Sequence, residues 1–299
     1  MATQQDQTAA GFSEISPRYS ELRYVVRTFF KRKLAVIGLV IILILVIVAI
    51  FAPLLAPYDP LEVNLDERLE MPSWNHPLGT DATGRDTLSR IIFGTQTSLA
   101  VAFGSMAIAA SVGITLGMLA GFFGGILHIV IMRLVDAVMS IPMLILALCL
   151  AALLGGGLKN VILALGITLT SIYARLMCAQ VLTIKENDYI MAERSMGATN
   201  LRIMMRHLMP NSFPPIIVMI TLQLGTMILA EAGLSFIGIG IQPPTPAWGA
   251  MVNSGYPYLF THPILSIAPG MAIALVVFGF NMAGDGLRDA LDPRLRGLI

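Results

Sequence analysis

One segment of the sequence comes close to the pattern of a phosphate-binding loop. Such a loop needs two glycines separated by four residues, then a lysine and a hydroxyl residue that hold phosphates and magnesium. Gly79 and Gly84 have the required spacing, and Arg85 stands at the lysine position. Asp86 replaces the hydroxyl residue, and its negative charge would repel a phosphate. The segment is therefore not predicted to bind a nucleotide.

Other residue types that perform catalysis are scattered. No histidine lies in a His-Glu-x-x-His pattern, and no serine lies in a Gly-x-Ser-x-Gly turn. Cys149 and Cys178 are far apart and lie in or beside apolar runs, where cysteine behaves as a small apolar residue. We therefore predict no catalytic, cofactor-binding or metal-binding residues in this chain, and no enzymatic activity. The four histidines are His76, His128, His207 and His262.

Two acidic residues interrupt long apolar stretches, where charge is costly and often functional. Asp136 follows Arg133 by three residues, a helical neighbour, which favours a structural ion pair. Glu231 is more isolated. Two interpretations of Glu231 stay open: it faces a substrate pathway, or it contacts a partner helix.

The composition of the chain indicates that most of it lies in an apolar environment. The chain has 299 residues, of which 56% are hydrophobic and 12% charged, against about 25% charged in typical soluble domains. A bilayer core about 30 Å thick accepts helices of about 20 apolar residues. We expect an all-α membrane protein with six transmembrane helices, near residues 34–52, 99–122, 137–154, 160–178, 213–237 and 265–284.

The distribution of positive charge predicts the orientation, because cytoplasmic segments carry the excess of Lys and Arg. With a cytoplasmic N-terminus, only Arg68, Arg85, Arg90 and Lys159 of the 19 basic residues lie outside. Both termini are therefore expected in the cytoplasm. The net charge of +1 and the lack of a basic, aromatic-lined groove give no indication of nucleic-acid binding.

These expectations divide the chain into segments. Residues 1–33 form a cytoplasmic segment with an amphipathic interfacial helix, 34–56 the first transmembrane helix, and 57–97 an acidic extracytoplasmic loop. Residues 98–285 form the transmembrane core, and 286–299 a cytoplasmic tail. A second outer loop, 238–263, has no charge and contains a Pro-rich stretch that excludes a regular helix.

Glycine recurs every four residues at the start of this core, at Gly113, Gly117, Gly121 and Gly125. On one helix these positions leave a bare stripe that lets another helix approach closely. The stripe indicates a packed bundle.

The cytoplasmic segment around residues 188–209 has the pattern of two short helices joined by glycine. Asp188 can cap a helix over 189–196, and Gly197 suits the left-handed residue that ends it. Thr199 can cap a second helix, which Pro210 is expected to end. An ordinary amphipathic connector and a docking site for a soluble partner both fit this pattern, and we favour docking mildly.

This segment resembles the coupling motif of ABC importer permeases, Glu-Ala-Ala, three residues, Gly, nine residues, Ile, one residue, Leu-Pro. Ala192, Gly197 and Pro210 match, whereas Met191 replaces the glutamate and Glu193 the second alanine. Further departures from the motif are His207 and Met209.

Three other stretches are similar to the second permease of dipeptide/oligopeptide/nickel importers. The first is His76-Pro-Leu-Gly-Thr-Asp81 with Gly84-Arg-Asp86 and Leu88-Ser-Arg90. The second is Leu234-Ser-Phe-Ile-Gly238 with Gln242-Pro-Pro-Thr-Pro246 and Trp248-Gly249. The third is Gly284-Asp-Gly-Leu-Arg-Asp-Ala-Leu-Asp-Pro293. The resemblance covers nearly the whole chain after its N-terminal segment.

The resemblance implies a type I ABC importer permease that works by alternating access in a bacterial or archaeal cytoplasmic membrane, surrounded by membrane lipid. Its implied partners are a second homologous permease, two cytoplasmic ATP-binding subunits that bind the ATP and Mg, and an extracytoplasmic substrate-binding protein. The residues implied for ATPase coupling are Met191, Ala192, Glu193, Gly197, Arg202, His207 and Pro210. Candidate contacts with the binding protein, from their place in the outer loops, are Asp81, Arg85, Asp86 and Trp248.

The expected cargo is a di- or oligopeptide. Nickel chelates, glutathione or another small solute are alternatives within the same machinery. An ion-coupled secondary transporter, using Glu231 or Asp136, is an alternative of a different class.

Overall fold

The chain folds into a bundle of long helices. The computed structural model describes residues 18–291, with side chains from Arg23 onward. Arg294, Arg296 and the Asp-Pro end of the third motif lie outside the described residues, as does most of the 1–33 segment. The helices are α1 (Arg18–Lys31), α2 (Lys33–Ile50), α3 (Ala52–Leu55), α4 (Thr87–Phe123), α5 (Gly125–Met139), α6 (Met143–Leu154), α7 (Leu158–Ile184), α8 (Asp188–Ser195), α9 (Asn200–Ile203), α10 (Met209–Phe236), α11 (Trp248–Gly255) and α12 (Ile264–Leu291). A π-helical turn (Met204–Leu208) and two short 3-10 turns, Leu65–Glu67 and Tyr256–Tyr258, complete the described elements.

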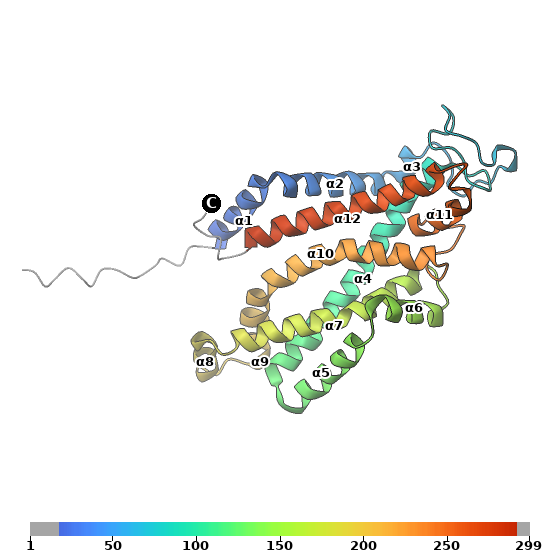
Figure 1. Cartoon of the computed structure of the whole chain (residues 1–299). Helices are drawn as coiled ribbons and strands as arrows, with labels where there is room; N and C mark the ends of the chain where they lie inside the picture. Colours follow the sequence, from blue (N-terminus) through green and yellow to red (C-terminus); the bar gives the residue numbers. More distant parts are fainter. Residues whose placement is uncertain (1–17, 292–299) are drawn as a thin grey trace, which may run out of the picture.

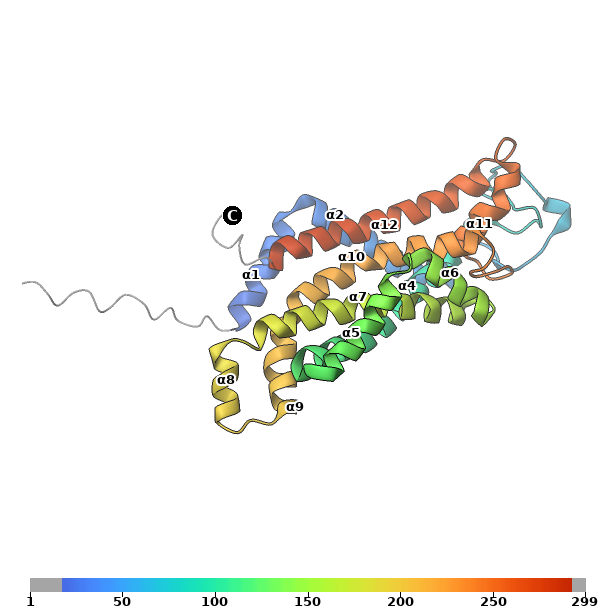
Figure 2. The same ribbon diagram turned by 60° about the horizontal axis from the view of Figure 1, so that its bottom comes forward.

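Two groups of segments mark the opposite ends of the bundle. In Figures 1 and 2, α8 and α9 lie at the same end as α1. The loop before α4 and helix α11 lie at the other end. We call these the α8 end and the α11 end.

Five helices in the described part are long and apolar enough to cross a membrane. A sixth crossing is obtained when α5 and α6, bent by 92° at their junction, are counted as one span. The expected single helix over 137–154 is therefore wrong. The chain leaves the helix after Met139 because Pro142 has no N–H to donate and disfavours helical backbone at the preceding residue.

Helix α4 begins earlier than expected, at Thr87, so the loop assigned to 57–97 ends eleven residues sooner. Asp86 is the cause, because its Oδ2 atom accepts a hydrogen bond from the backbone N–H of Ser89 at 2.7 Å and caps the helix. With 37 residues, α4 extends beyond the apolar run on which the expectation was based.

The glycine stripe packs α4 against α7, as predicted for three of its four residues. A Cβ atom at Gly113 would lie 2.6 Å from the carbonyl oxygen of Thr170, and one at Gly117 would lie 2.3 Å from that of Ala174. Gly121 makes a similar approach to α7, but Gly125 does not belong to the stripe. It lies in the turn to α5 with a φ of +55° and open space around it.

The N-terminal helices lie along α12 (Figure 1). Gly38 of α2 and Gly279 of α12 allow close contact, since a Cβ at Gly38 would lie 2.7 Å from the Gly279 carbonyl oxygen. Arg32, between α1 and α2, pairs with Asp289 at 2.8 Å. The segment 1–33 contains a helix, α1, as predicted, while its position at the cytoplasmic membrane interface stays a prediction.

Candidate functional site

Helix α8 ends in a well-defined turn at Gly197. The backbone N–H of Ala198 donates to the carbonyl of Glu193 at 3.1 Å, and the N–H of Gly197 donates to Arg194 at 3.0 Å. This pair of bonds is a Schellman motif, which requires a left-handed residue after the helix. Gly197 supplies it with a φ of +81°, as predicted.

The segment from α8 to α9 has a buried and an exposed side. Ile190 and Ile203 are fully buried and join the main hydrophobic core. Met191, Met196 and Leu201 are 55%, 74% and 66% exposed. Ala192, Gly197 and Arg202 are exposed on the same segment. The buried side fixes the segment to the bundle and leaves an outer surface that mixes apolar side chains with positive charge.

The two caps of this segment behave differently. Thr199 caps α9 as predicted, with its hydroxyl accepting from the backbone N–H of Arg202 at 3.4 Å. The prediction that Asp188 caps α8 is wrong. Asn187 occupies that position without a side-chain bond, and Asp188 is the first residue of the helix.

Pro210 does not end the second helix. Helix α9 continues through the π-helical turn into α10, so residues 200–236 form one helical stretch. The N–H of Met209 donates five residues back to Met204, and the wider turn accommodates a proline that can donate no bond. Pro210 lies in the first turn of α10, where its missing N–H is tolerated.

Polar and cation–π contacts attach helix α8 and the residues just before it to neighbouring elements. The Arg194 guanidinium lies 5.3 Å from the centre of the Phe122 ring. Just before α8, Lys185 donates to the carbonyl of Gly121 at 3.1 Å. Glu193 and His207 come within 3.4 Å of each other. Of the predicted coupling residues, the structure brings these last two together.

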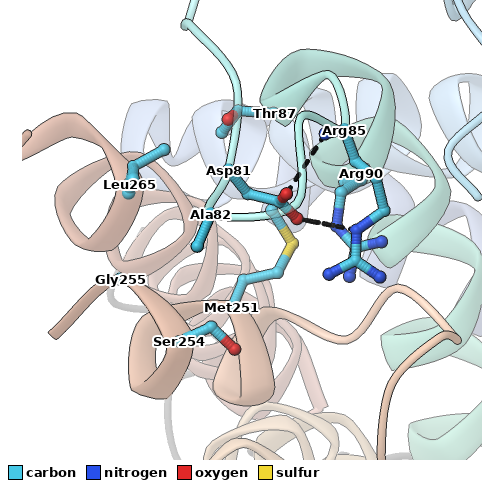
Figure 3. Close-up of a pocket in the computed structure, with 9 residues that line it drawn as sticks. All are labelled: Asp81, Ala82, Arg85, Thr87, Arg90, Met251, Ser254, Gly255 and Leu265. Atoms are coloured by element: carbon cyan, nitrogen blue, oxygen red, sulfur yellow. Dashed lines mark hydrogen bonds and ion pairs between the residues drawn. The ribbon is translucent and has the colours of Figure 1, made fainter. Parts of the chain in front are cut away.

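At the α11 end, a charged cluster surrounds a cavity of about 20 Å³, about the size of one water molecule (Figure 3). The Asp81 Oδ2 atom accepts from Arg85 Nε at 2.8 Å and lies 3.6 Å from Arg90 Nε. Arg90 also donates to the carbonyl of Pro60 at 2.9 Å. The cluster thus ties the loop before α4 to the first turn of that helix.

Asp81 is held as a carboxylate. Burial opposes its ionisation, but hydrogen bonds from Thr83 and Arg85, together with the Arg85 charge, hold the pKa of the Asp81 carboxyl below its usual value. Its Oδ1 atom accepts from the backbone N–H and the hydroxyl of Thr83 at 2.8 and 2.6 Å.

Asp86 and Trp248 lie inside the protein. Asp86 is 3% exposed, and its Oδ1 atom lies 2.9 Å from His76 Nδ1 in addition to its capping bond. Trp248 is 1% exposed and donates from its indole to the carbonyl of Ile91 at 3.0 Å. Their side chains are therefore occupied in joining the loops to α4. Asp81 and Arg85 keep some exposure, 18% and 11%.

The side chain of Glu231 is buried inside this chain. It is 0% exposed, and its Oε1 atom accepts from the Ser235 hydroxyl at 2.7 Å. The same hydroxyl accepts from the backbone N–H of Ile241 at 3.0 Å. The interpretations of a pathway-facing or partner-facing Glu231 do not agree with this placement, which connects α10 to the following loop.

Asp136 pairs with Arg175 of α7, and the expected pair with Arg133 does not form. The two residues are 39 positions apart, so helical spacing could not reveal the contact. The charge distribution counts Arg175 among the cytoplasmic residues, whereas it lies inside α7, a helix apolar enough to cross a membrane. Its pairing with Asp136 was not predicted. Each side chain of the pair is 49% exposed.

Comparison with protein families gives two matches. Residues 113–297 match the family described as binding-protein-dependent transport system inner membrane component. Residues 20–73 match the N-terminal TM domain of oligopeptide transport permease C.

Curated relatives cover most of the chain. A dipeptide transport system permease protein of Alkalihalophilus pseudofirmus is 43% identical over 89% of this chain and 88% of its own length. A di/tripeptide transport system permease protein of Pseudomonas aeruginosa is 43% identical over 93% of both chains. A glutathione transport system permease protein of Pectobacterium atrosepticum is 41% identical over 90% of both.

Among solved structures, the chain is similar to one from the MetNI methionine ABC transporter in an inward-facing conformation. The TM-score is 0.55 at 23% identity, covering 68% of this chain and 96% of that one. At this identity the likeness shows the fold alone.

Proposed function

Because this chain belongs to the family of binding-protein-dependent transport system inner membrane components, we propose that it is the membrane subunit of an ATP-driven peptide importer. Its matched relatives carry dipeptides, di/tripeptides and glutathione, which is itself a tripeptide. Short peptides are therefore the cargo that the comparisons favour.

The attachment of the α8–α9 segment to α10 is the observation that carries this proposal. The outer surface of the segment presents Met191, Met196 and Leu201 beside Arg202, a combination suited to a groove on a soluble partner. Its inner side is continuous with a membrane-spanning helix, without an intervening loop. A displacement of the segment by its partner is thus transmitted to the bundle.

We assign the partner on this surface to an ATP-binding subunit. ATP and Mg would be bound and hydrolysed there, and this chain would only receive the resulting movement. In alternating access, ATP binding favours one packing of the bundle over another, and the energy of the change comes from the difference in affinity for the two states. The α8 end would face the cytoplasm, where ATP is available.

The remaining partners follow from this orientation. A second homologous permease would complete the pathway, and a substrate-binding protein would approach the α11 end from outside the cytoplasmic membrane. Because Asp86 and Trp248 are buried, the proposed contact with the binding protein would use the partly exposed Asp81 and Arg85. The two buried residues would hold the loops in position for it.

The test is uptake by the complete complex, reconstituted in liposomes with second permease, ATP-binding subunits and binding protein. Dipeptide should accumulate only when ATP and binding protein are both present. Met191→Asp, which places a charge on the proposed docking surface, should lower ATP hydrolysis stimulated by the loaded binding protein at least five-fold. The matched control is Val63→Asp, because Val63 is equally exposed in the loop at the other end, 56% against 55% for Met191. Affinity for the loaded binding protein is measured for both variants, because Val63 lies at the end that this protein would approach.

Two results would contradict the proposal. Uptake driven by an ion gradient without ATP would identify a secondary transporter. Uptake of glutathione in preference to dipeptides would contradict the dipeptide substrate but not the ATP-driven mechanism. The relative from Pectobacterium atrosepticum is a glutathione permease.

A further inference from the structure

The ion pair between Asp136 of α5 and Arg175 of α7 joins helices that are apolar enough to cross a membrane. Helix α7 has 27 residues, and Arg175 is four residues from its centre, which corresponds to about 6 Å along the axis. The hydrocarbon core extends about 15 Å to either side of the bilayer middle. If α7 is centred in the bilayer, the pair lies at a depth where neither headgroups nor bulk water reach it from the lipid side.

The pair is nevertheless open on the surface of this chain. Each of its side chains is 49% exposed, and Arg133, one helical turn from Asp136, is exposed as well. Three charged groups with a net charge of +1 cannot face lipid tails without a large cost in free energy. A water-filled pathway hydrates all three groups, whereas a protein contact would have to supply a further acidic group to compensate the net positive charge.

From this geometry we infer that Asp136 and Arg175 line the translocation pathway and bind the charged ends of a peptide as it passes. The inference rests on the proposed function. The dipeptide, di/tripeptide and glutathione cargoes of the relatives all carry an ammonium group and a carboxylate. Arg175, and Arg133 beside it, would receive the carboxylate, while Asp136 would receive the ammonium group.

The chemistry of the pair suits a site of passage. Arginine binds a carboxylate through two parallel hydrogen bonds, and aspartate accepts several hydrogen bonds from an ammonium group. When a zwitterionic peptide arrives, one ion pair is exchanged for two of the same kind. The net gain is small, so the peptide is held in place but is free to leave, as conduction requires.

The first test separates a substrate contact from a structural ion pair. The double variant Asp136→Asn/Arg175→Gln removes both charges and leaves no unpaired one. In the reconstituted complex with saturating loaded binding protein, we expect dipeptide uptake to fall at least ten-fold, while subunit assembly and stimulated ATP hydrolysis stay within two-fold of wild type. The control, Arg32→Gln/Asp289→Asn, neutralises the pair at the α8 end, with side chains 48% and 30% exposed, and should keep uptake within two-fold.

The second test measures water access and does not depend on transport. In a variant with Cys149→Ser and Cys178→Ala, single cysteines are placed by Ala179→Cys beside Arg175 and by Leu34→Cys on the exposed face of α2. Both positions lie about 11–12 Å from the centres of their helices, toward the α8 end, so their depths match. In the assembled complex, a membrane-impermeant sulfonate thiol reagent should modify the first at least ten times faster than the second.

The outcomes distinguish this inference from the proposed function. If the wild-type complex imports no peptide, the proposed function fails, and rapid modification at position 179 still places the pair in an aqueous pathway. If wild type imports peptide and the double variant imports it equally well, or if position 179 reacts as slowly as position 34, the assignment of the pair is overturned.

Discussion

The Nε2 atom of His207 lies 3.4 Å from the Oε1 atom of Glu193, and the two side chains are about equally buried at 20% and 21% exposure. Both residues stand where the coupling motif of the importer family has an apolar residue. The departures from the motif are therefore in contact with each other, across the turn between α8 and the helix that follows. Glu193 and His207 thus form a polar contact between two motif positions that are otherwise apolar.

This contact predicts coupled effects on stability. Glu193→Ala or His207→Ile alone leaves the other polar group half-buried without its partner, whereas the double variant restores the residue types of the motif. We expect the double variant to be more stable than the sum of the single effects by about 0.5–1 kcal/mol. Thermal unfolding of the purified chain in detergent measures it. Strict additivity would show that the two residues do not interact.

A second prediction concerns the turn after α8. Gly197→Ala places a side chain at a φ of +81°, which costs about 1–2 kcal/mol even though no atom lies within 4 Å of the new Cβ. ATP hydrolysis stimulated by the binding protein should fall several-fold, because the Schellman turn holds α8 in position. The matched control is Gly270→Ala in α12, which also has open space but lacks a positive φ and should keep wild-type hydrolysis.

A third prediction addresses the contact between α4 and α7. Gly117→Ala brings a Cβ to 2.3 Å from the backbone oxygen of Ala174, so the helices must separate. We expect a loss of about 1–3 kcal/mol and a lower yield of folded protein in size-exclusion chromatography. Gly233→Ala, whose Cβ would lie 3.9 Å from Leu144, should leave the yield unchanged. Equal yields for both variants would contradict the close approach.

A fourth prediction concerns pH. Since the folded-state pKa of Asp81 lies below the value of 3.8 for an unperturbed aspartate, its stabilising contribution is complete above about pH 5. It is lost as the pH falls below 3.8 and through the folded-state pKa. The protection factors of the amides in the loop before α4, which are hydrogen-exchange rates corrected for the intrinsic pH dependence of exchange, should therefore fall in acid. In Asp81→Asn this fall should be smaller, and an unchanged pH profile would show that Asp81 does not stabilise the loop.

A fifth prediction follows from the burial of Glu231. Glu231→Gln retains an oxygen that can accept from Ser235, so transport by the complex should stay within two-fold of wild type. Glu231→Ala removes the acceptor and leaves the Ser235 hydroxyl to the N–H of Ile241 alone, which should cost about 1–3 kcal/mol. A large loss of transport in the glutamine variant, with normal folding, would indicate a functional role for the acid.

Much of the fold was predictable because hydropathy over about 20 residues decides which segments enter a membrane. The exceptions have local causes. Pro142 breaks a run that is apolar throughout, and hydropathy does not register a missing N–H donor. Pro210 was expected to end a helix, but a π-helical turn accommodates the proline and the helix continues into α10.

The site was less predictable, because its contacts join distant segments. Gly197 and Thr199 were identified correctly, since turns and caps depend on residues close in sequence. The partner of Asp136 depends on how α5 packs against α7, which no local pattern reveals. Trp248 and Asp86 stood out within family motifs, yet their burial shows that residues typical of a family can serve its architecture.

The close packing of α4 against α7 decides where the bundle can deform. The backbone of α4 is in close contact with α7 at Gly113, Gly117 and Gly121, so these two helices cannot slide past each other without steric clashes. The bent pair α5–α6 is bounded by Gly124 and Gly125 at one end and by Gly155 to Gly157 at the other, all with positive φ. Most of these glycines have open space around them. These glycine turns can act as hinges at both ends of the α5–α6 pair. A change in the width of the pathway beside Asp136 is therefore made most easily by rotating this pair.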